Sequence, residues 1–161
     1  MTGLLAWIAS TSFSTWLQES PSVWGFPTAL AFHTVGMGVL VGASWAVALR
    51  LLGFARGIPI GPMRGLFRVM WVGFWVNAAS GVVLFISHPV ERGTSIVFGF
   101  KMLFIVLGMV ATSRLGRIFA AAGDGPVTET PATTRLAFAS IALWVAAITA
   151  GRLVAYIGGN G

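Results

Sequence analysis

Four ionisable side chains stand within or beside long apolar stretches of this sequence, namely His33, His88, Lys101 and Arg152. Ionisable groups inside apolar membrane segments are costly and usually serve a function. Imidazole nitrogen is a common axial ligand of haem iron, whereas lysine and arginine side chains pair with anionic groups. The four residues therefore predict a binding site for a ligand that contains a metal, carries negative charge, or has both properties.

The stretches that carry these residues are long and apolar enough to cross a bilayer. A membrane helix needs about 20 mostly apolar residues. The sequence offers stretches at about 27–49, 69–87, 95–113 and 136–157. Short connections between them predict an all-α, antiparallel bundle of four transmembrane helices over residues 26–161. Residues 1–25 form a separate segment, which is predicted to be a short helix at the membrane interface.

The composition supports a membrane protein and excludes several other classes. Of the 161 residues, 57% are apolar and only 9% are charged, whereas a soluble domain has about 25% charged residues. The sequence has no cysteine, which excludes thiolate catalysis, iron–sulfur clusters and covalently attached c-type haem. Neither a phosphate-binding loop nor a serine with an acidic partner in the membrane is found, so hydrolytic chemistry is not expected.

Basic residues are unevenly distributed among the predicted loops. The loops after the first and third stretches contain Arg50, Arg56, Arg64, Arg68, Arg114, Arg117 and Arg135. Because positive charges gather in cytoplasmic loops, both termini are predicted on the opposite side, the periplasm of a bacterium. The net charge of +6 is explained by this topology in the inner membrane, and a nucleic-acid partner is not expected.

Three of the ionisable residues share one depth in the predicted bundle. His33, Lys101 and Arg152 each lie about 10 Å from the outer end of their stretch, given a rise of 1.5 Å per residue. His88 lies nearer the surface. The outer side has few carboxylates to neutralise these cations, and this shortage favours an anionic ligand from outside the chain. Haem b, a flat apolar ring with two propionates, is such a ligand.

Two glycines indicate where a flat ring would lie. Gly36 lies on the same helix face as His33, and Gly81 on the same face as His88. We expect His33 to ligate the haem iron, His88 to be the candidate second ligand, and the cations to hold the propionates. The predicted cofactor site comprises His33, His88, Lys101, Arg152, Gly36 and Gly81. Such a protein would move electrons between the quinone pool and a periplasmic redox partner.

Each ionisable residue also has a purely structural interpretation. His33 can hydrogen-bond a neighbouring helix, and His88, which precedes a proline, can belong to an interfacial loop. Lys101 has a stem long enough to bring its amine out to the interface. Arg152 can pair with a carboxylate of an outer loop. Gly38 and Gly42 form a GxxxG pair, which predicts close packing of the first span on a neighbour.

Two further functions stay open. Met37 follows His33 by one helical turn, and Met102 follows Lys101 directly. Because imidazole and thioether groups bind copper, these residues with His88 predict a copper-binding membrane protein as an alternative. The second alternative is a structural or anchor subunit of a larger membrane complex. In each case we expect a homo-oligomer or a subunit of an assembly, and no reaction of its own is identified.

Several strings resemble an uncharacterised bacterial family of four-span inner-membrane proteins, a domain of unknown function. The strings are GFPTALAFHTVGMGVLVG, LRLLGFARGIPI, KMLFIVLGM and ALWVAAITAGRLVAYIGG, and the resemblance covers nearly the whole chain. The family pattern is matched by His33, by Lys101 with Met102, and by Gly151 and Arg152 followed by Tyr156. The resemblance implies the fold and location without an activity. The layout is also similar to four-helix b-type cytochromes and CopD-like membrane domains.

Overall fold

The computed structural model describes residues 2–54, 57–123, 125, 127 and 130–158. Over these residues the chain is helical and contains no strand, so the predicted all-α fold is confirmed. The helices are α1 (Thr2–Ala9), α2 (Ser12–Glu19), α3 (Phe26–Leu51), α4 (Ile60–Ser87), α5 (Pro89–Thr94), α6 (Ile96–Ala122) and α7 (Pro131–Gly158). Helices α3, α4, α6 and α7 are each long and apolar enough to span a membrane.

Two of these helices are longer than the apolar stretches that predicted them. Helix α4 begins at Ile60 rather than at residue 69, and Pro62 lies in its first turn, where the missing backbone N–H costs little. Helix α6 continues to Ala122 rather than ending at residue 113. Its added turns present Arg114 and Arg117 as exposed side chains. Apolar length therefore locates a span but misses the polar turns that extend it.

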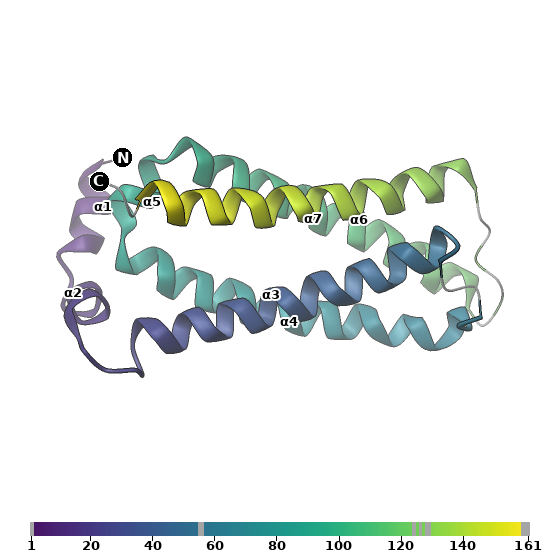
Figure 1. Cartoon of the computed structure of the whole chain (residues 1–161), viewed down its shortest axis with the longest axis horizontal. Helices are drawn as coiled ribbons and strands as arrows, with labels where there is room; N and C mark the ends of the chain where they lie inside the picture. The colour runs from purple at the N-terminus through teal and green to yellow at the C-terminus, as the bar shows by residue number, and fades with distance from the viewer. Residues whose placement is uncertain (1, 55–56, 124, 126, 128–129, 159–161) are drawn as a thin grey trace.

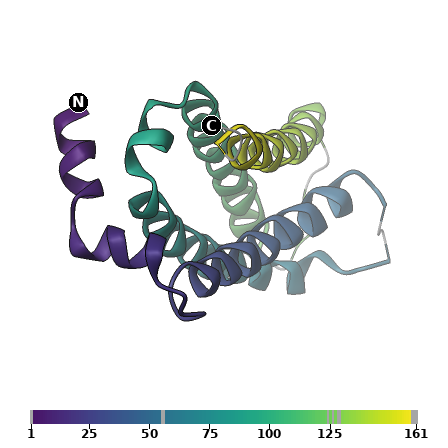
Figure 2. The same ribbon diagram turned by 60° about the vertical axis from the view of Figure 1, so that its left-hand side comes forward.

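The four long helices run together along the longest axis of the molecule (Figure 1). The start of α1 and the end of α7 lie at one end of the bundle with α2 and α5, whereas the end of α3 and the start of α7 lie at the other. We call these two parts the terminal half and the loop half. Helices α1 and α2 lie across the end of the bundle beside α4 and α5, which Figure 2 shows from the side.

The closest helix pair, α3 and α4, meets through two glycines. A Cβ atom on Gly36 would lie 2.7 Å from the backbone nitrogen of Asn77. A Cβ atom on Gly73 would lie 2.8 Å from the backbone nitrogen of Leu40. Only glycine fits at such distances, so the two backbones approach each other where small residues permit it.

The predicted GxxxG contact is not the one that forms. Added Cβ atoms at Gly38 and Gly42 would meet no described atom within 4 Å. These two glycines face away from the neighbouring helices, and Gly36 serves the contact instead. The motif correctly predicted a close contact through glycine on α3, but it predicted the wrong face of the helix.

The loop half contains most of the buried core. Its best-buried apolar side chains include Leu40, Val47, Met70, Leu115, Phe119 and Trp144. A buried polar network lies among them, with the Ser44 hydroxyl 3.3 Å from that of Thr112 and 3.2 Å from that of Ser140. The Trp144 indole N–H donates to the Thr112 hydroxyl at 3.4 Å. Helices α3, α6 and α7 are thereby joined by both packing and hydrogen bonds.

The predicted single N-terminal helix is two helices that pack on the end of the bundle. The Ser14 hydroxyl of α2 donates to the backbone oxygen of Ile86 at 2.7 Å. Leu5 of α1 packs so closely on Gly93 that a Cβ atom there would lie 2.7 Å from it. Their other faces expose aromatic rings, including Trp7 at 64%. Exposed tryptophan at the end of a membrane bundle is typical of the headgroup region.

Candidate functional site

His33 is held in the groove between α3 and α4 by a reciprocal pair of hydrogen bonds. Its Nδ1 atom lies 3.0 Å from the backbone oxygen of Asn77, and the Asn77 side-chain amide donates to the backbone oxygen of His33 at 2.8 Å. The hydroxyl of Ser80 lies 3.3 Å from Nδ1. This confirms the structural interpretation that the imidazole bonds a neighbouring helix.

The same hydrogen bond fixes the tautomer of His33. A carbonyl oxygen only accepts, so Nδ1 carries the proton and the neutral ring keeps its lone pair on Nε2. No hydrogen-bond partner of Nε2 is found among the described residues. Metal-binding histidines almost always donate their other nitrogen to a carbonyl or carboxylate in this way. The structural interpretation and the ligand interpretation of His33 are therefore compatible.

Gly36 and Gly81 surround His33 with close packing. Gly36 lies against the backbone of α4, as described above, and a Cβ atom on Gly81 would lie 3.2 Å from the imidazole Cε1 atom. The room that these glycines provide is thus taken by α4 and by the imidazole ring. The predicted slot for a flat ring beside them is filled by the protein itself, and any such ring must approach His33 from another side.

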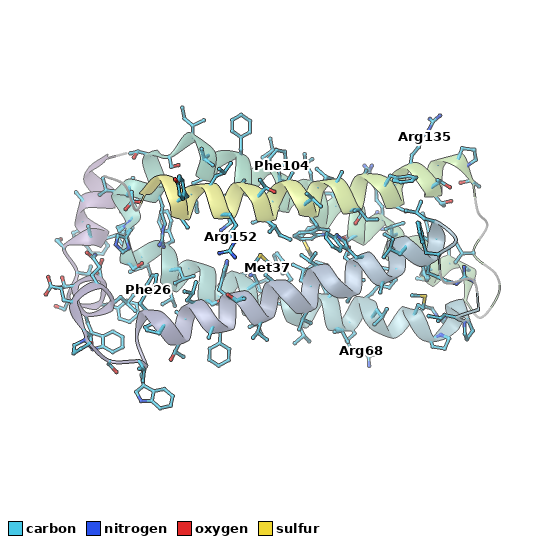
Figure 3. The ribbon with its side chains drawn as sticks, viewed as in Figure 1. Phe26, Met37, Arg68, Phe104, Arg135 and Arg152 are labelled. Carbon is cyan, nitrogen blue, oxygen red and sulfur yellow. The ribbon has the colours of Figure 1, made fainter. Side chains whose placement is uncertain are left out.

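The packing of α6 on α7 places Lys101 against Gly151, the residue that precedes the exposed Arg152. The aliphatic stem of Lys101 lies against Gly151, where a Cβ atom would be 3.6 Å from Cε and 3.8 Å from Nζ. The Lys101 amine also lies 5.8 Å from the centre of the Phe98 ring. The neighbouring Arg152 projects from α7 into the space between α7 and α3, whereas Arg68 and Arg135 point away from the bundle (Figure 3).

Arg92 of α5 is a third cation of this region. Its charge acts on both His33 and Lys101, and the Lys101 charge also acts on His33. Burial lowers the pKa of the Arg92 guanidinium, and the adjacent Glu91 carboxylate partly opposes this effect. The guanidinium nevertheless stays charged at any physiological pH. It donates to the Ser87 hydroxyl at 3.4 Å.

Lys101 and Arg152 have no carboxylate partner in the described part of the chain. Glu19 ends α2, and Glu91 lies in α5 beside Arg92. No ion pair joins either one to Lys101 or Arg152 among the described residues. The predicted alternative in which a loop carboxylate pairs with Arg152 is therefore not seen there. A lysine within a membrane span, such as Lys101, is unfavourable without a counter-ion.

The terminal half around these residues is loosely packed. No residue is buried in the first twelve positions of α6, residues 96–107, or in residues 26–35 of α3. A helix packed on its neighbours normally buries one face along its length. Helices α3 and α7 also diverge toward the terminal end (Figure 1). In this half, therefore, these parts of α3 and α6 contribute no buried residue to the core.

His88 lies apart from His33. It is exposed at the junction of α4 and α5, where its Nδ1 atom is 3.0 Å from the Ser87 hydroxyl. Its ring meets Phe26 edge-on with the ring centres 6.5 Å apart. Since the imidazole of His33 lies beside Gly81, His88 stands two helical turns, or about 10 Å, farther along α4. The structure does not bring the two histidines together as a pair of axial ligands.

The two methionines proposed as copper ligands, Met37 and Met102, lie in different surroundings. Met37 projects into the space between α3 and α7, near the region that Arg152 enters (Figure 3). Met102 is 46% exposed on α6. No group of three or more His, Cys, Asp or Glu suited to a metal ion occurs among the described residues.

Sequence reasoning did not single out Asn77 or Arg92 as members of this site. Asn77 precedes Gly81 by one helical turn on the same face of α4, but its bond to His33 follows from the register of α3 on α4, which one sequence does not reveal. Arg92 lies between the second and third apolar stretches, and the short helix α5 places it where its charge acts on Lys101.

No known family, characterised protein or solved structure matches this chain.

Proposed function

We propose that this multi-pass membrane protein binds haem b through His33 and transfers electrons. One observation carries the proposal: the Nε2 atom of His33 has no hydrogen-bond partner among the described residues, and the charges of Lys101 and Arg92 both act on this imidazole. It lies in the half of the bundle where residues 26–35 of α3 and 96–107 of α6 are not buried. An anionic ligand of considerable size that accepts a nitrogen donor would satisfy each of these features. Haem b, with one iron and two propionates, has this chemistry.

Each residue has a defined part in this proposal. Nε2 of His33 would hold the iron, while the bond of Nδ1 to Asn77 keeps the lone pair on Nε2 and orients the ring. Lys101, Arg92 and Arg152 would compensate the propionate charges. His88 is left out of the ligand set because of its distance along α4.

A bound haem would supply a one-electron carrier between a quinol in the membrane and a redox protein at the terminal end. The quinol would release two protons for every two electrons that it gives up as it becomes a quinone. The excess of arginine in the loop half supports a bacterial inner-membrane location with both termini in the periplasm. Membership of the uncharacterised four-span family named above is part of the same proposal.

The test is an absorption spectrum of the purified protein, oxidised and after dithionite reduction. We expect a Soret band in the wild type and its loss in His33→Ala. The matched control is His88→Ala, which removes the other imidazole of the chain and should keep the band. A full Soret band in His33→Ala, or none in wild type expressed with added haem, would contradict the proposal.

Elemental analysis of the same preparations separates the alternatives. Copper bound after loading in the reduced state, and lost in Met37→Leu, would replace haem with copper handling at this site. Purification without any metal or porphyrin, but always with the same partner subunits, would instead favour an anchor of a larger membrane complex. Either outcome would overturn the haem assignment while leaving the transmembrane bundle unchanged.

A further inference from the structure

A second site of interest is an apolar groove on the other side of the His33 contact. Its volume is about 500 Å³, and it is enclosed by α2, the start of α3 and the facing turns of α4. Trp16 of α2 closes its outer end by packing on Gly25, where a Cβ atom would lie 3.5 Å from the indole ring. Phe32, which is 59% exposed, borders its open side.

The lining of the groove limits what it can hold. None of its described lining residues is charged, so the groove offers no partner for the phosphate of a phospholipid. Its walls are largely aromatic and branched aliphatic, which suits a flat ring and a hydrocarbon tail. The indole N–H groups of Trp16 and Trp24, at the outer end, have no acceptor among the described residues. They can donate to uncharged carbonyl oxygens.

The groove adjoins the His33 contact through Ser80. Ser80 lines it, and the Ser80 hydroxyl lies 3.3 Å from Nδ1 of His33. A molecule in the groove is therefore separated from the imidazole by a single side chain of α4. Few molecules of the bilayer combine an uncharged head with two carbonyl acceptors, a flat ring and an apolar tail.

We propose that this groove is a docking site for an isoprenoid quinone, with its ring between α3 and α4 under Trp16. The inference rests on the proposed function for its redox role, since the quinone would be the electron partner of the haem. The geometry of the groove does not depend on haem, which allows the two proposals to be tested separately.

The experiment measures binding of decylubiquinone to the detergent-purified protein by quenching of its intrinsic tryptophan fluorescence. We expect saturable binding to the wild type and at least tenfold weaker binding to Ala79→Leu, whose side chain would fill the groove. Ala29→Leu fills the same groove from α3 and should act alike. The matched control is Ala139→Leu, an exposed position of α7, which should bind as the wild type does. Circular dichroism checks that each variant is folded.

Several results would overturn the docking proposal. These are an absence of saturable binding to the wild type, or equal binding to both groove variants and the control. Another is a phospholipid, seen by native mass spectrometry, that the wild type retains, the groove variants lose and the quinone does not displace. The spectrum of the same samples reports haem independently. Haem without quinone binding refutes only the groove, and quinone binding without haem refutes only the proposed function.

Discussion

The loop half and the terminal half are built from the same four helices but are stabilised differently. In the loop half, Leu115 and Phe119 of α6 are buried, and Ser44, Thr112 and Ser140 satisfy one another's hydroxyl groups. In the terminal half the same helix α6 buries no residue over 96–107, and its Lys101 has no carboxylate partner in the described chain. Polar groups in a membrane bundle can therefore either hydrogen-bond neighbouring helices or have no partner within the chain and remain available to a ligand.

The largest expected effect comes from a pair of phenylalanines on α6. Phe119 is 1% exposed in the loop half, and Phe100 is 52% exposed in the terminal half. Phe119→Ala should lower the free energy of unfolding by about 3 kcal/mol because it leaves a cavity. Phe100→Ala should cost about 0.5 kcal/mol or less, as is usual at loosely packed sites. Unfolding in mixed micelles measures both, and equal losses would show that the halves are packed alike.

A smaller effect is expected from a pair of glycines at the α3–α4 contact. Gly73→Ala would place a Cβ atom 2.8 Å from a backbone nitrogen of α3, so the helices must separate, at a cost of about 2 kcal/mol. Gly38→Ala meets no described atom within 4 Å and should leave stability unchanged. If neither substitution lowered the free energy of unfolding in the same assay, the result would contradict the close approach of α3 to α4 at Gly73.

The smallest effects should have opposite signs in the two halves. Ser44→Ala breaks the hydroxyl network and should destabilise the protein by about 0.6 kcal/mol, the usual worth of such bonds in membranes. Lys101→Met removes an uncompensated cation and should stabilise the cofactor-free protein by about 1 kcal/mol. The same change should weaken retention of haem. Destabilisation of the cofactor-free protein by Lys101→Met would indicate that the lysine already has its partner.

The sequence was sufficient to locate the four long apolar helices. Apolar length marks a membrane helix whatever its neighbours are. The rotation of each helix and its register on a neighbour depend on contacts between residues that are distant in the sequence. For this reason the GxxxG motif predicts packing through Gly38, whereas Gly36 makes the contact.

The candidate site was predicted less completely for the same reason. Asn77 becomes the partner of His33 only through the register of α3 on α4. The charge of Arg92 acts on Lys101 because Pro89 begins a short helix, although a proline after an apolar stretch usually predicts a loop. The residue types indicated the chemistry, and the folded arrangement determined which of them meet.

The contact between α2 and α4 also has a consequence for biosynthesis. Ser14 bonds the backbone of Ile86, which follows it by 72 residues in the chain. At a synthesis rate of about 5–20 residues per second, the first two helices leave the ribosome on the order of 4–14 s before this partner does. During that delay the two helices lack their final contacts, and their exposed tryptophans can hold them at the lipid surface. The N-terminal segment can therefore stay bound to the bilayer surface until α4 and α5 have been inserted.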